Sequence, residues 1–161
     1  WDEDALPAQY NPVMYIVSGV LNKNFTGGGF NSVNKLLIQY TTADDVLHLP
    51  LASLKTSNYW ENTWFNDVLL TQLGFDLMIT TPYLGNSYMP GTGVFYLQHE
   101  QTIGGYPFLD LFLSMRLKRA RFFLSYNNVL SGLVSNNYFT LANYPMKPRY
   151  LGLGLGWIFY D

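Results

Sequence analysis

Apolar and polar residues alternate with a period of two in several stretches of this chain. The clearest is FLDLFLSMRL, residues 108–117, where Leu109 and Leu111 fall on one side while Asp110 and Arg116 fall on the other. Successive side chains of a β-strand point to opposite faces, so this period predicts strands rather than helices. The same pattern, punctuated by turn residues, predicts strands at 12–25, 31–43, 57–66, 68–83, 105–117, 119–131 and 147–160.

The last of these strands, in the segment YLGLGLGWIFYD, presents one apolar face and one nearly bare face. Leucines alternate with glycines, aromatic residues follow, and no polar residue falls between Leu151 and Phe159. Two environments fit this pattern: a soluble core packed closely against the glycines, or a lipid bilayer on the leucine side. In the membrane interpretation, the residues expected to face lipid or to join an aromatic girdle are Leu151, Leu153, Leu155, Trp157, Phe159 and Tyr160.

The connections between the predicted strands alternate between short and long. In chain order they are 26–30, 44–56, 66–67, 84–104, the region around Lys118, and 132–146. Tight periplasmic turns and longer extracellular loops are typical of membrane barrels, and a soluble sandwich has no physical reason to sort its loops in this way. We therefore expect residues 1–161 to form a single barrel portion, with an irregular or extracellular lead-in at 1–11 and strands over 12–160.

The number of strands bears on how the barrel closes. With seven strands, the start of the first strand and the end of the last strand lie on opposite sides of the membrane. Complete bacterial barrels usually have an even strand number. The expected fold is therefore all-β, an antiparallel transmembrane β-barrel of which this chain is the C-terminal portion, with about 7–8 strands. An eighth strand at 94–100 would instead allow a small closed barrel.

Composition narrows the class of protein further. Charged residues make up 12% of the chain and aromatic residues 17%, and the formal net charge is −2, so a nucleic-acid partner is not expected. The chain has no cysteine, which excludes disulfides and thiolate metal sites. No stretch approaches the roughly 18 apolar residues of a membrane-spanning helix, whereas a barrel strand needs only about 9–11 alternating residues.

In the predicted strands 68–83, 105–117 and 119–131, the charged residues fall on one side. Asp110, Arg116 and Arg121, with Asp76 as a further member, project toward the inferred lumen and are candidates for the lining of a pore. An arginine or lysine facing lipid near the membrane midplane costs about 2–4 kcal/mol, which accounts for this segregation. In the other interpretation, the arginines solvate a periplasmic turn and Asp110 balances charge inside a filled barrel.

The two histidines give no indication of catalysis. Some outer-membrane barrels are lipid-degrading enzymes that use a serine and a histidine, but neither His48 nor His99 has a serine two residues away on the same strand face. Two isolated histidines also do not define a metal site. We therefore expect no enzyme activity, no metal and no cofactor.

Several segments taken in order resemble a known family. NYWENTWF, VLLTQLGFDLMITTPYLGNSYMP, the run from YMPGTGVFYLQHE to RARFFLSYNNV, and the final NNYFTLANYPMKPRYLGLGLGWIFYD are similar to the C-terminal region of the putative porin family of Bacteroidota outer membranes. The resemblance implies a protein made with a signal peptide and inserted into the outer membrane by the barrel-assembly machinery. Family members are longer than this chain. The terminal strand resembles the signal that this machinery recognises, although Asp161 here follows the final aromatic residue.

The leading functional hypothesis is passive passage of solutes through a polar lumen, with outer-membrane lipid as the surrounding partner. A non-conducting barrel could instead scaffold a secretion or nutrient-uptake complex, docking a lipoprotein or another outer-membrane subunit through the aromatic loop 137–145. A soluble β-sandwich that binds carbohydrate through exposed tryptophan and tyrosine is the third hypothesis. Dependence on detergent for extraction separates the first two from the last.

Overall fold

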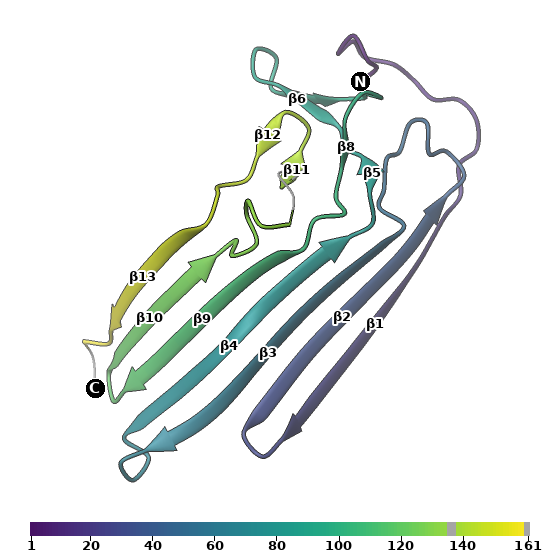
Figure 1. Cartoon of the computed structure of the whole chain (residues 1–161). Coiled ribbons are helices and arrows are strands. Elements are labelled where there is room, and N and C mark those ends of the chain that lie inside the picture. The colour runs from purple at the N-terminus through teal and green to yellow at the C-terminus, as the bar shows by residue number, and fades with distance from the viewer. Residues whose placement is uncertain (135–137, 160–161) are drawn as a thin grey trace.

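The structure, a computed structural model, is described for residues 1–134 and 138–159. A single antiparallel sheet of 7 strands dominates it, in the order β1-β2-β3-β4-β9-β10-β13 (Figure 1). No helix in this part of the chain is long and apolar enough to cross a membrane. The strands of the large sheet are β1 (Ile16–Gly27), β2 (Phe30–Thr41), β3 (Ala52–Trp64), β4 (Leu69–Thr80), β9 (Phe108–Leu117), β10 (Ala120–Asn127) and β13 (Tyr150–Trp157).

A long strand occupies each of the regions in which alternation predicted one. The largest difference is in β3, which begins at Ala52 rather than at residue 57. Its first residues alternate small or polar side chains with Leu54 and Thr56, so the contrast between the two faces is weak there. Lys55 consequently belongs to a strand and not to a loop.

The eighth strand considered at 94–100 does not join the large sheet, so that interpretation was wrong. Only Val94–Tyr96 is extended, as β7, and it pairs with β6 (Ser87–Met89) in a separate two-stranded ribbon. The chain turns directly afterwards because Gln98 Oε1 accepts hydrogen bonds from the backbone N–H groups of Glu100, at 2.9 Å, and Gln101, at 2.7 Å. A side chain that satisfies its own local backbone ends the strand.

The two ends of the large sheet differ in the length of their connections. The hairpins β1–β2, β3–β4 and β9–β10 turn tightly at one end, here called the hairpin end, and the long connections gather at the other, the loop end (Figure 1). Gly28 and Gly29 form the first turn with φ of +58° and +84°, a conformation that favours glycine. The loop end carries the ribbon β6–β7 and two further ribbons, β5 (Tyr83–Leu84) with β8 (Thr102–Ile103) and β11 (Phe139–Leu141) with β12 (Tyr144–Pro145).

The best-buried residues lie in the loops and not in the sheet. Ala43, Ile103, Tyr106 and Ala142 are each at most 2% exposed, and all of them belong to the loop end. Within the described chain no second sheet covers either face of the large one, which is open with β1 and β13 at its edges. The loops therefore hold a small core of their own, while the sheet is a single layer whose faces need an external environment.

Candidate functional site

On β4, β9, β10 and β13, the strand register places the apolar alternating residues of all four strands on the same face of the sheet. Directly paired residues of antiparallel strands share a face. Leu113 pairs with Leu73 of β4 and with Leu124 of β10, which pairs in turn with Leu153 of β13. We call this side the apolar face. On these strands it carries Leu69, Thr71, Leu73, Phe75, Leu77, Ile79, Leu109, Leu111, Leu113, Met115, Leu117, Ala120, Phe122, Leu124, Tyr126, Leu151, Leu153, Leu155 and Trp157.

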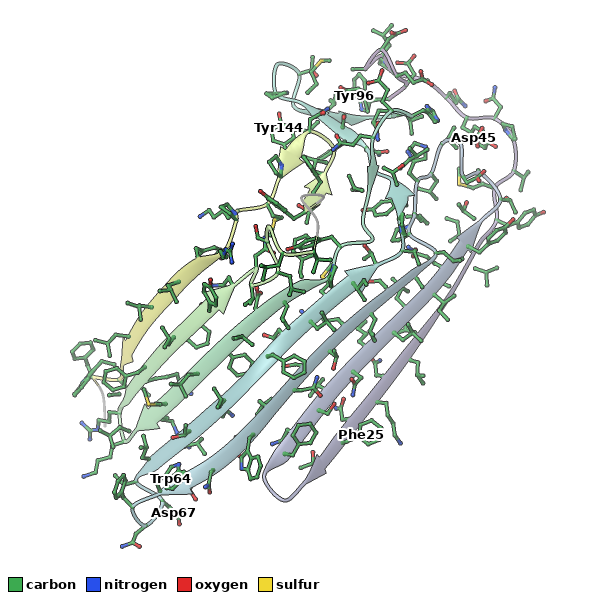
Figure 2. The ribbon with its side chains drawn as sticks, viewed as in Figure 1. Phe25, Asp45, Trp64, Asp67, Tyr96 and Tyr144 are labelled. Atoms are coloured by element: carbon green, nitrogen blue, oxygen red, sulfur yellow. The ribbon has the colours of Figure 1, made fainter. Side chains whose placement is uncertain are left out.

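The opposite side, the polar face, collects nearly all of the strand charges. Among the described strands of the large sheet, Lys23 alone puts a charge on the apolar face. The charged residues of the polar face are Lys35, Lys55, Glu61, Asp76, Asp110, Arg116 and Arg121. Figure 2 shows the two ends of the large sheet, with Trp64 and Asp67 at the hairpin end and Asp45, Tyr96 and Tyr144 at the loop end.

All of the charged residues selected from the sequence lie on the polar face, where they form two pairs. Asp76 of β4 lies directly opposite Asp110 of β9, and we call these residues the acidic pair. Arg116 of β9 lies directly opposite Arg121 of β10, and these residues are the arginine pair. Since a strand rises about 3.3 Å per residue, the two pairs stand about 20 Å apart along β9. The acidic pair is nearer the loop end and the arginine pair is nearer the hairpin end.

A third like-charged pair escaped the sequence analysis. Lys35 of β2 lies directly opposite Lys55 of β3. Lys55 is two residues from Ser57, the partner of Asp76, so the lysine pair is a diagonal neighbour of the acidic pair. The alternation around Lys55 is weak, so the strand predicted from the sequence began after this residue and the pair was missed.

The acidic pair borders a cavity of about 520 Å³ beneath the loop 128–149. Asp110 Oδ1 accepts a hydrogen bond from the backbone N–H of Asn128 at 2.7 Å. The Asn128 side chain then accepts from the Tyr106 hydroxyl at 2.6 Å and donates to the Lys147 carbonyl at 2.9 Å. Lys55, Asp76, Asp110 and Lys147 all line the cavity, which therefore holds charges of both signs.

Buried polar groups hold this loop in place. Asn128 is 5% exposed and adopts a left-handed conformation with φ of +49°, which asparagine tolerates better than most residues. Burial raises the pKa of the Tyr106 phenol, so the hydroxyl stays protonated and remains a donor. The position of the loop over the polar face thus depends on a short network anchored at Asp110.

In β13, the leucines and the glycines lie on opposite faces of the sheet. Leu151, Leu153 and Leu155 are strongly exposed on the apolar face, and Leu153 reaches 84%. The glycines share the polar face with β10 residues, and only Gly152 is tightly enclosed, because a Cβ there would stand 2.5 Å from Ser125 Oγ. Of the expected aromatic residues, Trp157 and Phe159 are exposed, and Tyr160 lies outside the described residues.

The two histidines, which looked isolated in the sequence, meet at the loop end. The His48 and His99 rings are 5.1 Å apart between centroids in an edge-on arrangement. His99 Nδ1 lies 2.9 Å from Glu3 Oε1, which ties the lead-in to the loops. The pKa of His48 is lowered, first by burial and then by His99. Only the folding of separate loops brings these side chains together.

Comparison with known proteins identifies a family. A family model described as a putative porin matches residues 1–161, the whole chain. No curated protein and no solved structure matches the chain.

Proposed function

Because the chain belongs to the putative porin family, we propose that its sheet is part of the wall of a β-barrel in the bacterial outer membrane. The apolar face contacts lipid, and the polar face lines a water-filled lumen. The observation that carries this proposal is the segregation of charge between the faces, since a charge on the lipid side near the midplane would cost about 2–4 kcal/mol. The tight turns are then periplasmic and the long loops extracellular.

The open edges of the sheet support a larger barrel. Unpaired backbone N–H and C=O groups cannot be left in a bilayer, so β1 and β13 need further strands beside them. A soluble β-sandwich requires a second layer over the apolar face, and the described chain provides only two-stranded ribbons at one end. The single layer therefore favours the membrane proposal over a soluble carbohydrate-binding module.

The proposed activity is passive diffusion of small polar solutes through the lumen. The acidic pair, the arginine pair and the lysine pair act as fixed charges that raise or lower the local concentration of ions and charged solutes. The cavity beneath loop 128–149 marks the narrowing that this loop imposes from the loop end. Passage needs no covalent step, so no catalytic residue and no cofactor is proposed.

Reconstitution of the full-length polypeptide into planar bilayers of neutral lipid tests this function. Stepwise conductance is expected, and the double variant Asp76→Asn/Asp110→Asn should lower the permeability of K⁺ relative to Cl⁻. Lys23→Gln on the apolar face is the matched control and should leave that ratio unchanged, because its charge does not face the lumen. Correctly inserted protein that gives no conductance would overturn the proposal.

A second function, a non-conducting subunit that scaffolds an outer-membrane complex, is favoured by one feature of the loops. Asn143 joins the loop 128–149 to the loop 81–107, because its backbone N–H donates to Gln101 Oε1 at 2.8 Å and its side chain donates to Ser87 Oγ at 3.4 Å. Interlocked loops suit a docking platform as well as a constriction. Stoichiometric copurification with a partner, together with silent bilayers, would select this function.

A further inference from the structure

The arginine pair is the place where the charges of the polar face are least compensated. Like charges directly opposite each other across two strands destabilise a sheet. At the loop end, the lysine pair and the acidic pair are diagonal neighbours of opposite sign, so their charges offset one another. The arginine pair has no such counterpart. Its neighbours in the same row are Leu70 of β4 and Gly156 of β13, and neither can ionise.

Two carboxylates border cavities that the arginines also line: Asp67 of the β3–β4 turn with Arg116, and Glu61 of the polar face with both arginines. Glu61 lines the same cavity as the arginines, but its Oε2 accepts a hydrogen bond from Gln72 Nε2 at 2.6 Å. Within the described residues, neither Arg116 nor Arg121 has a carboxylate oxygen within 4.0 Å. Two guanidinium groups therefore lie on the polar face of the sheet without a carboxylate partner for their charge-assisted hydrogen bonds.

Space for a small ligand lies directly beside these groups. A cavity of about 310 Å³ is bordered by both arginines together with Glu61, Gln72 and Ser114. The Ser114 hydroxyl and the second N–H of the Gln72 amide, whose first is donated to Glu61, can donate hydrogen bonds there. Gly156, opposite Arg121, has no side chain, and even a Cβ there would lie 4.0 Å from Arg121 Cβ. The bare glycine leaves the arginine side chain room to turn toward the lumen.

We propose that the arginine pair is a binding site for a tetrahedral oxyanion at the hairpin end of the lumen. Guanidinium groups bind phosphate-type oxygens in a two-pronged geometry, and two of them side by side hold one anion more firmly than either alone. The inference rests on the proposed function in one respect, namely that the polar face is the lumen. Free phosphate and the phosphate of a lipid headgroup share this chemistry, so the test separates them.

Thermal unfolding of the full-length protein in neutral detergent gives a readout that does not require conductance. Inorganic phosphate should raise the unfolding temperature above that in chloride of equal ionic strength, because a ligand that binds the folded state stabilises it. In the double variant Arg116→Gln/Arg121→Gln, the phosphate concentration needed for half of the effect should increase about tenfold or more. Lys35→Gln/Lys55→Gln also removes two positive charges from the polar face, and this control should respond like the native protein.

The possible outcomes test three things separately: the anion site, the source of the phosphate, and the proposed passage of solutes. An equal phosphate response in the arginine variant and the native protein would overturn the site. So would the absence of any response to free phosphate together with no stabilisation in nanodiscs of phosphatidylglycerol. Stabilisation in nanodiscs of phosphatidylglycerol but not by free phosphate would identify the ligand as a lipid headgroup. Phosphate added to the hairpin side of conducting bilayers should reduce the current through the native protein and the lysine control, and not through the arginine variant. Silent bilayers with an intact phosphate shift would refute the proposed passage while leaving the anion site standing.

Discussion

The two halves of the apolar face differ in chemistry although they belong to one continuous sheet. Over β4, β9, β10 and β13 this face is apolar apart from Thr71. Over β2 and β3 it is interrupted by a polar quartet, Ser32, Asn34, Thr56 and Asn58, in which Ser32 pairs with Asn58 and Asn34 with Thr56. The first half can contact hydrocarbon directly. The second half can do so only if its polar groups satisfy one another.

The quartet largely meets that condition. Thr56 Oγ1 donates to Asn34 Oδ1 at 2.7 Å, and Asn34 Nδ2 donates to Ser32 Oγ at 2.9 Å. Asn58 Nδ2 donates to Thr56 Oγ1 at 2.8 Å. Ser32 and Thr56 are only 7% and 8% exposed, so the hydroxyl groups are shielded by their own neighbours. The comparison teaches that, in the proposed barrel, polar side chains are compatible with a face that contacts lipid as long as they satisfy one another's hydrogen bonds.

Lys23, the one charge on this face, follows a related rule. Its Nζ lies 5.5 Å from the centre of the Phe25 ring, and Phe25 is two residues closer to the hairpin turn on the same face. The side chain thus extends along apolar surface toward the end of the strand, as lysines do when they reach for the membrane interface.

The largest effect is expected from placing a charge on the wholly apolar half. Leu153→Arg should destabilise the inserted protein by about 2–4 kcal/mol, because Leu153 lies in the middle of β13 on the apolar face, which contacts lipid in the proposed barrel. Urea unfolding in liposomes measures this change. Gly154→Arg adds the same charge one residue away on the polar face, where a Cβ makes only ordinary contact, at 3.6 Å with Phe123 Cβ. Equal destabilisation by both variants would contradict the assignment of the faces.

A smaller effect should follow from opening the polar quartet. Thr56→Val leaves Asn34 Oδ1 without its donor and Asn58 without its acceptor, so a loss of about 1–3 kcal/mol is expected in the same assay. Removing the whole quartet as Ser32→Ala/Asn34→Leu/Thr56→Val/Asn58→Leu should recover most of that loss, because no unpaired group remains. A quadruple variant less stable than Thr56→Val would show that these side chains bind something other than one another.

The contrast between the halves also marks what the sequence could reveal. Period-two alternation located the seven long strands and assigned Asp76, Asp110, Arg116 and Arg121 to one side, since a strand's faces depend only on its own residues. Which residues pair across strands depends on turn geometry and on chain segments far apart, so neither the arginine pair nor the quartet was predictable. Lys55 was not assigned to a strand for a local reason: apolar and polar residues alternate only weakly at the start of β3.

The smallest effect is expected at the loop end, outside both halves of the apolar face. There the contact between His48 and His99 should change in stability with pH. Burial and the neighbouring His99 lower the pKa of His48 below its ordinary 6.5, while Asn86 and the charge of Asp44 oppose the shift more weakly. A histidine with a lowered pKa binds protons more readily once its loop opens. The loop contact is therefore fully stable above pH 6.5 and loses stability as pH falls through the lowered pKa.

Amide hydrogen exchange between about pH 5 and about pH 8, corrected for the intrinsic exchange rate, measures this contact. Exchange in residues 42–51 should accelerate on the acidic side in the native protein, whereas the long strands should keep their protection. His48→Gln should remove the pH dependence because glutamine cannot titrate in this range. Faster exchange at acidic pH that persisted in His48→Gln would show that the effect does not come from His48.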